Sequence, residues 1–99
     1  MRDAKRGVAH SITIQARSGA EGQTAVRLGF TATKKYGNAV VRNRAKRRLR
    51  HAIRAVLAEK PCAPYDLVLI AREALPDRDY PTLLQDIRYC LKKAGVYDV

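Results

Sequence analysis

Residues 34–54 read KKYGNAVVRNRAKRRLRHAIR, a run that predicts a basic helix. The other predicted elements lie before and after it in the chain. Nine of these 21 residues are Lys or Arg, and none is Asp or Glu. The stretch without acidic residues extends from Glu21 to Glu59. Because like charges repel one another, a cluster of one sign costs stability. The usual reason for keeping such a cluster is a polyanionic partner.

The composition predicts a small, soluble protein. The 99-residue chain carries a net charge of +11 and is 46% hydrophobic, which predicts one domain over residues 1–99 with a modest core. The start has no apolar signal segment, and no apolar run approaches the ~20 residues that span a bilayer. We therefore expect a cytoplasmic protein without membrane contact. Its two cysteines, Cys62 and Cys90, are expected to be reduced, although the sequence leaves one disulfide open.

Alternating apolar residues predict two strands before the basic stretch. In residues 8–16, Val8, Ile12 and Ile14 share one side, and residues 25–33 alternate in the same way. The glycine-containing residues between these segments predict a loop that joins an antiparallel pair. Residues 1–7 are polar, and we expect them to be flexible.

The later elements follow from capping residues and apolar runs. Asn38 is the predicted N-cap of a helix over residues 39–58. The continuous apolar run of residues 66–71 predicts a strand covered on both faces. A second helix is predicted from Tyr80, and Gly95 ends it. The order is β-β-α-β-α, a small α+β sandwich with helices packed on a sheet.

At about 100° per residue, the helix over residues 39–58 divides into an apolar seam and a basic remainder. The seam consists of Val41, Ala45, Leu49, Ala52, Ile53 and Val56. Arg42, Lys46 and Arg50 follow one edge of the seam with Asn43 beside them, Arg44 and Arg48 lie on the opposite edge, and Arg47 and Arg54 point outward.

A solvated basic face is the simpler alternative for this helix. However, the seven basic residues between positions 42 and 54 have no acidic partner within the helix, and like charges four residues apart destabilise a helix by roughly 0.2–0.5 kcal/mol per pair. A membrane surface fits poorly, because the seam is needed for the core and lacks bulky aromatic residues. Arginine suits bidentate contacts with phosphate and stacking on bases, which favours a nucleic acid.

The stretch GFTATKKYGNAVVRNRAKRRLR, residues 29–50, resembles the signature of the bacterial ribonuclease P protein subunit, whose helix carries an Arg-Asn-Arg motif. DLVLIAR, residues 66–72, is similar to the last strand of that family, and the similarity covers residues 25–94. The resemblance implies an α/β sandwich with an unusual left-handed βαβ crossover, similar to that of a ribosomal-protein domain.

The resemblance also implies that the protein is a subunit of an endoribonuclease and not its catalyst. In this family a large RNA subunit with bound Mg²⁺ removes the 5′ leader of precursor tRNA. The protein binds that RNA subunit and the single-stranded leader. We therefore expect one RNA subunit per protein, and neither a catalytic residue nor a metal site on the protein itself.

The site residues follow from the motif and from the helix edges. The RNA-binding residues are expected to be Lys34, Lys35, Asn38, Arg42, Asn43, Arg44, Lys46, Arg47, Arg48, Arg50 and Arg54. The resemblance implies a leader cleft between the sheet and the basic helix, with Phe30, Tyr36, Arg42, Asn43, Lys46 and Arg50 as its candidate residues. Phe30 shares its strand face with Val26 and Leu28, so a core position is the competing interpretation.

Two further alternatives bear on function. Family members begin with a helix that carries a phenylalanine lining the cleft, whereas only seven polar residues precede the first predicted strand here. Two explanations stay open: this chain begins inside the domain, or the cleft is incomplete. A ribosomal or regulatory RNA-binding module without a nuclease role is the main rival. A protein-only nuclease is disfavoured, because His10 and His51 are the only histidines and no carboxylate cluster has metal-ligand spacing.

Overall fold

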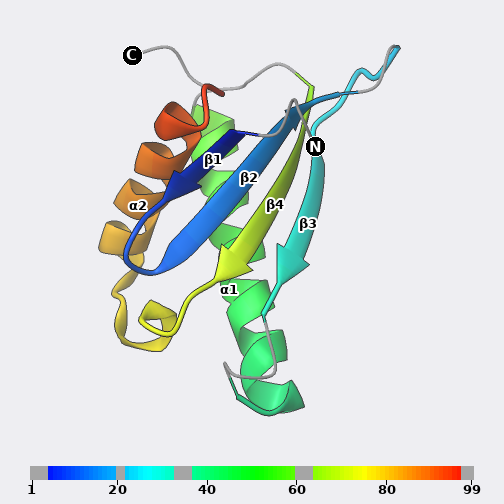
Figure 1. Ribbon diagram of the computed structural model, residues 1–99. Coiled ribbons are helices and arrows are strands. Elements are labelled where there is room, and N and C mark those ends of the chain that lie inside the picture. The colour runs from blue at the N-terminus through cyan, green and yellow to red at the C-terminus, as the bar shows by residue number, and fades with distance from the viewer. Residues whose placement is uncertain (1–4, 20–21, 33–36, 60–63, 97–99) are drawn as a thin grey trace.

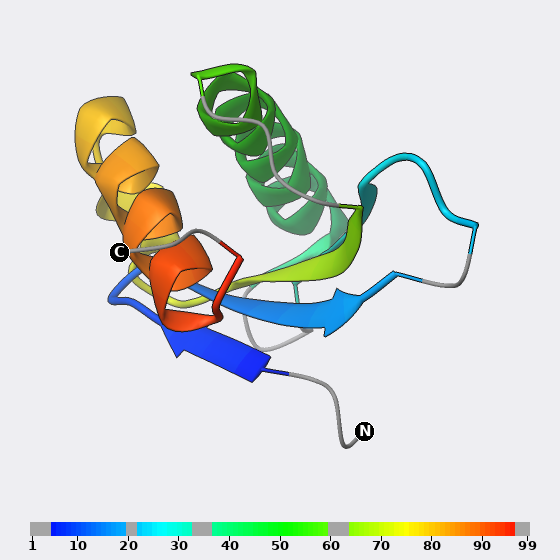
Figure 2. The ribbon, with the colours of Figure 1, turned by 90° about the horizontal axis from the view of Figure 1, so that it is seen from above.

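The computed structural model describes residues 5–19, 22–32, 37–59 and 64–96, which form a four-stranded sheet with two helices on one of its faces (Figures 1 and 2). The sheet order is β1-β2-β4-β3. The elements are β1 (Lys5–Val8), β2 (Ile12–Ser18), β3 (Arg27–Thr31), α1 (Ala39–Glu59), β4 (Tyr65–Ala71), a 3₁₀ turn (Leu75–Asp77) and α2 (Tyr80–Lys93). The predicted α+β sandwich is confirmed.

The segment predicted as one strand over residues 8–16 is instead a hairpin of β1 and β2. Lys5 lies opposite Ala16 and Val8 opposite Thr13 in an antiparallel register. Residues 5–7, expected to be flexible, are therefore part of the sheet. The error has a simple cause: Val8 keeps even spacing with the buried Ile12 although a turn separates them, and alternation alone does not reveal such a turn.

The strand pairing also differs from the prediction. β4 pairs antiparallel with β2 and parallel with β3, so Leu69 lies opposite both Ile14 and Phe30. The predicted antiparallel pair of the first two strand segments is wrong, because the later strand β4 inserts between β2 and β3. Loop composition indicates a turn but does not determine which strand becomes the neighbour.

The unit β3–α1–β4 is a crossover between parallel neighbours. In Figure 1 both strands run downward, α1 lies behind the sheet, and the chain moves from β3 leftward to β4. Figure 2, seen from above, also shows α1 on the side of the sheet that faces away from the viewer in Figure 1. The crossover is therefore left-handed, as the resemblance implies, whereas about 98% of such connections are right-handed.

The core lies between the helices and one face of the sheet. Ile12 and Ile14 of β2 and Leu67 and Leu69 of β4 are at most 1% exposed. The buried residues of α1 are Ala45, Leu49, Ala52, Ile53 and Val56. These residues confirm the predicted seam except at Val41, which is half-buried.

The opposite face of β4 is not covered by a described element. Leu67, Leu69 and Ala71 are buried, whereas Val68 and Ile70, which alternate with them, are half-exposed. The predicted coverage of both faces is therefore wrong within the part of the chain that the structure describes. Both helices pack on the same face (Figure 2), and a run as short as residues 66–71 does not distinguish one covered face from two.

Capping interactions define the ends of the helices. The backbone N–H of Val41 donates to Asn38 Oδ1 at 3.0 Å, which confirms the predicted N-cap of α1. At the end of α2, Gly95 has a φ of 79°, and the N–H groups of Gly95 and Val96 donate to the carbonyls of Lys92 and Leu91. This is a Schellman motif. Neither described helix is long and apolar enough to cross a membrane.

Cys90 is a free thiol on the buried side of α2. It is fully buried, and burial raises the pKa of its thiol to about 12. A thiol with so high a pKa is a poor nucleophile at neutral pH. Cys62 lies outside the described residues.

Candidate nucleic-acid interface

Helix α1 carries the predicted RNA-binding residues on surfaces that the core leaves open. Its first turns continue beyond the ends of β3 and β4 (Figure 1), and Val40 in those turns is 65% exposed. Arg44, Arg47, Arg50 and Arg54 are exposed as well. Arg42, Lys46 and Arg48 are half-buried, and Asn43 is exposed. Lys34, Lys35 and Tyr36 lie outside the described residues.

Most of the positive charge of α1 is not used to hold the fold together. Among the described residues, the side chains of Arg44, Lys46, Arg47 and Arg54 have no ion-pair or hydrogen-bond partner. The described ion pairs join Arg17 and Arg27 to Asp66, Arg78 to Asp86, and Arg88 to Glu59. The outward charges of α1 are therefore available to a ligand.

The side chains of two arginines of α1 donate hydrogen bonds within the protein. Arg42 Nη1 donates to the carbonyl oxygen of Gly37 at 2.7 Å, next to the helix start. Arg48 Nη1 donates to the carbonyl oxygen of Leu75 at 2.5 Å, which ties α1 to the 3₁₀ turn. A role of Arg48 in the fold is thus visible, and the sequence pattern contains no signal for it because 27 residues separate the partners.

Arg50, on the same edge of α1 as Arg42 and Lys46, reaches β3. The guanidinium carbon of Arg50 lies 5.4 Å from the centroid of the Phe30 ring, within cation–π range. Phe30 is half-buried and packs against the core. The structure therefore brings together two of the predicted cleft residues, and the ring of Phe30 has both a core contact and a cation over it.

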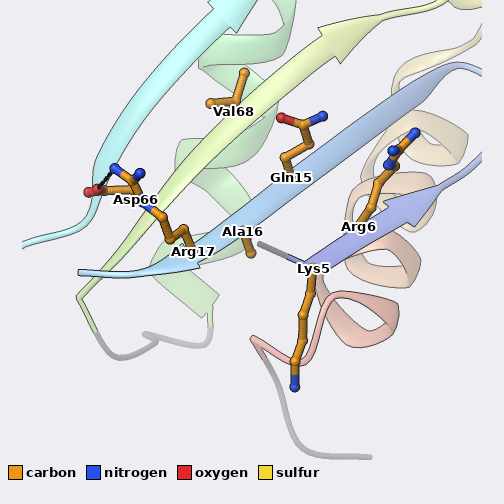
Figure 3. A pocket seen from close by; sticks show the side chains of 7 residues that line it. All are labelled: Lys5, Arg6, Gln15, Ala16, Arg17, Asp66 and Val68. Carbon is orange, nitrogen blue, oxygen red and sulfur yellow. Dashed lines mark hydrogen bonds and ion pairs between the residues drawn. The ribbon is translucent and has the colours of Figure 1, made fainter. Parts of the chain in front are cut away.

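A pocket of about 500 Å³ lies at the other face of the sheet, and no residue predicted for the leader cleft lines it (Figure 3). Its lining residues come from three strands: Lys5, Arg6, Gln15, Ala16, Arg17, Asp66 and Val68. Sequence reasoning missed them, because β1 was not recognised. The cross-strand register, with Arg6 opposite Gln15 and Arg17 opposite Asp66, brings them together.

Asp66 organises one wall of this pocket. It accepts hydrogen bonds from Arg27 at 2.8 Å and from Arg17 and Gln23 at 3.2 Å. The bond from Arg27 is the largest cause that holds the pKa of Asp66 well below its usual range; burial opposes it, and Arg17 and Gln23 add to it. Asp66 therefore stays ionised and fixes two guanidinium groups at the end of the sheet.

The described residues contain no group of three or more His, Cys, Asp or Glu side chains that could hold a metal ion. Phosphate recognition by basic side chains is the chemistry that α1 and the pocket offer, and at α1 the ring of Phe30 lies beside Arg50.

Comparison with known proteins agrees with this chemistry. A family model described as Ribonuclease P matches residues 1–95. The ribonuclease P protein component of Gluconacetobacter diazotrophicus is 56% identical over 70 residues, which are 71% of this chain and 60% of that protein. The component of Ruegeria pomeroyi is 47% identical over 92 residues, or 91% of this chain and 74% of that protein. The chain thus spans less than two thirds of the first of these relatives.

Solved structures show the same fold. The ribonuclease P protein of Staphylococcus aureus matches 98% of this chain and 86% of its own, with a TM-score of 0.78 at 24% identity. That of Thermotoga maritima matches 98% of this chain and 87% of its own, with a TM-score of 0.76 at 23% identity. These structures show the shared fold, and the family match over residues 1–95 with the 47% identity to the Ruegeria pomeroyi component shows that the chain belongs to the ribonuclease P protein family.

Proposed function

We propose that this protein is the RNA-binding subunit of ribonuclease P and assists a catalytic RNA subunit in removing the 5′ leader from precursor tRNA. The observation that carries the proposal is the uncompensated charge of α1 in a member of this family. Arg44, Arg47 and Arg54 have no partner among the described residues, so they can contact phosphates without breaking an interaction of the fold.

The proposed division of labour places chemistry on the RNA. One RNA subunit binds one protein, and Mg²⁺ is held by the RNA, where it supplies the metal-assisted hydrolysis of the phosphodiester. The protein contributes positive charge that offsets repulsion between the RNA subunit and its RNA substrate. This effect is largest when Mg²⁺ is scarce, because fewer cations then screen the two RNAs.

We assign the single-stranded leader to the α1 edge of Arg42, Asn43, Lys46 and Arg50. Arg42 and Arg50 are eight residues apart, roughly 12 Å along the helix, which suits about two phosphates of a single strand. The pocket of Figure 3 is the competing location, since it is concave and carries Lys5 and Arg6. If the leader lies in the pocket, Phe30 positions Arg50 and does not stack on a base.

Reconstitution with the matching RNA subunit at low Mg²⁺ tests the function. Precursor-tRNA cleavage should rise when the protein is added. A folded protein that gives no stimulation contradicts the proposal. Recovery of mainly ribosomal RNA in a pull-down would instead support the ribosomal or regulatory alternative.

Paired variants test the leader assignment. Arg42→Ala and Lys46→Ala should each lower the slope of log affinity against log salt by roughly 0.7–0.9 for a precursor that carries a leader. The same variants should matter less for a precursor without a leader. If Arg6→Ala shows this leader dependence and Lys46→Ala does not, the leader lies in the pocket.

A further inference from the structure

The outer face of α2 carries an exposed aromatic ring among basic residues, away from α1. Arg88 reaches across to Glu59 of α1, with Nη2 2.7 Å from Oε1. Tyr89 is the next residue, so it lies about 100° farther round the helix. Asp86, which reaches Ser11 in the turn between β1 and β2, marks the side of α2 that faces β1. Tyr89 is 49% exposed.

Basic groups from two elements lie at the C-terminal end of α2, which follows Tyr89 in the chain. Lys93 lies one turn farther along α2, with Nζ 5.7 Å from the centroid of the Tyr89 ring. Lys92 is exposed beside it. The end of the Lys5 side chain, from β1, lies beside Gly95, since Nζ is 3.7 Å from where a Cβ at Gly95 would stand. We call Lys5, Tyr89, Lys92 and Lys93 the α2 surface.

The packing of β1 on α2 explains why Lys5 reaches this surface. A Cβ at Gly7 would collide with the backbone of Cys90, so β1 approaches α2 as closely as a strand without a side chain allows. The one acidic residue of α2, Asp86, is turned inward and bonded to Arg78 and Ser11. The α2 surface is therefore positive and contains no carboxylate of its own helix.

A purely structural explanation covers part of this arrangement. Lysines in the last turn of a helix interact favourably with the helix dipole, which accounts for Lys92 and Lys93. The helix dipole does not account for Lys5, which comes from β1, or for the half-exposed side chain of Tyr89. Lys5 also lines the pocket of Figure 3, so this one lysine belongs both to the pocket and to the α2 surface.

We propose that the α2 surface binds a short unpaired stretch of RNA, with its lysines on phosphates and the ring of Tyr89 stacked on a base. An unpaired stretch is required because a base within a helix is already stacked on its neighbours. This inference rests on the proposed function, and it adds a second contact region that faces away from α1. We take the RNA subunit as the source of this stretch, because the leader of the precursor is assigned to α1; an effect on precursor tRNA alone would contradict that choice.

Substitution of the tyrosine is the main test. Tyr89→Ala should weaken binding of the RNA subunit by about 5- to 150-fold, the range expected for loss of one base stack. Tyr89→Phe should retain binding, because the ring remains. Tyr80→Ala is the matched control: Tyr80 is 39% exposed at the other end of the same helix and should leave affinity unchanged. Circular dichroism and melting confirm that each variant is folded.

Charge variants supply the second readout. Lys92→Gln with Lys93→Gln should lower the salt slope by roughly 0.7 for each phosphate that a lysine no longer neutralises. Arg72→Gln removes one exposed positive charge from the loop after β4 and should leave the slope unchanged. Each variant is titrated with the RNA subunit alone, with precursor tRNA and with precursor that lacks its leader, so that the affected arm identifies the RNA.

The outcomes separate this inference from the proposed function. If Arg47→Ala weakens RNA binding and the Tyr89 and lysine variants match the wild type in all three arms, the α2 surface is not an RNA contact while the proposed function stands. If Tyr89→Ala alters self-association and not RNA affinity, the surface is a protein interface and the inference is wrong. If the wild-type protein binds none of the three RNAs, the proposed function itself fails.

Discussion

Helices α1 and α2 pack on the same face of the same sheet, but they use their charges differently. In α2 the carboxylate of Asp86 is 2.6 Å from Ser11 Oγ and 2.9 Å from Arg78 Nε, and Arg88 pairs with Glu59. In α1, Arg44, Arg47 and Arg54 have no such partners among the described residues. Asp86 and Arg88 of α2 hold elements together, whereas Arg44, Arg47 and Arg54 of α1 add positive charge that the described residues do not neutralise in the free protein. A helix that keeps such charge is suited to a polyanion.

The largest change in stability is expected for a substitution in the apolar seam of α1, and a much smaller one for a substitution on its basic surface. Leu49 is fully buried between α1 and the sheet, so Leu49→Ala should destabilise the protein by about 3 kcal/mol through reduced burial and a residual cavity. Arg47→Ala, two residues earlier and exposed, should change the free energy of unfolding by less than about 0.5 kcal/mol. Urea denaturation measures both. Equal losses would show that the outward charges do support the fold.

The buried carboxylate of α2 should be the next most sensitive position. Asp86→Ala leaves the hydroxyl of Ser11 and the guanidinium of Arg78 without their acceptor and should cost about 2–3 kcal/mol. A double-mutant cycle with Arg78→Ala isolates the pair. A loss below about 0.5 kcal/mol would mean that water replaces the carboxylate at no cost, and the contrast with α1 would fail.

The same carboxylate predicts how stability depends on pH. Burial pushes the pKa of Asp86 upward, but hydrogen bonds from Arg78 and Ser11 outweigh it, and the pKa is lowered. A lowered folded-state pKa means that the contribution is complete above the unfolded value of about 4 and is lost as the pH falls through the folded value. Stability should therefore decrease below about pH 4, and Asp86→Asn should flatten that decrease. An unchanged acid limb in the variant would contradict this assignment.

Adjacent arginines of α1 provide the smallest and most specific test. Arg48→Ala removes the bond to the Leu75 carbonyl and should cost about 1 kcal/mol of stability. Arg47→Ala should leave stability nearly unchanged but lower RNA affinity and its salt dependence. Melting temperature should therefore fall in Arg48→Ala and not in Arg47→Ala, and RNA titration should show the loss of affinity in Arg47→Ala. Two variants that behave alike in both measurements would show that α1 does not divide its charges between fold and ligand.

The features that the sequence predicted correctly depend on residues close together in the chain. Apolar residues at helical spacing indicated α1 to within one residue of its end at Glu59, and the Asn38 cap was recognised. The start of α2 at Tyr80 and its end before Gly95 follow from the same local chemistry. The left-handed crossover came from the family resemblance and not from the residues themselves.

The features that were missed are pairings between distant segments. β4 lies between β2 and β3, the first predicted strand is a hairpin, and the lining of the pocket depends on β1. The bond from Arg48 to Leu75 and the approach of Lys5 to Gly95 belong to the same class.

For this protein, then, the sequence by itself determined the helices, their caps and the basic character of α1, because these depend on periodicity and on hydrogen bonds within a few residues. The tertiary structure alone decided which strands pair, which arginines serve the fold and where positive charge meets an aromatic ring. Those choices depend on which distant side chains fit together when one face of the sheet is buried, and that information is not contained in any single stretch of the chain.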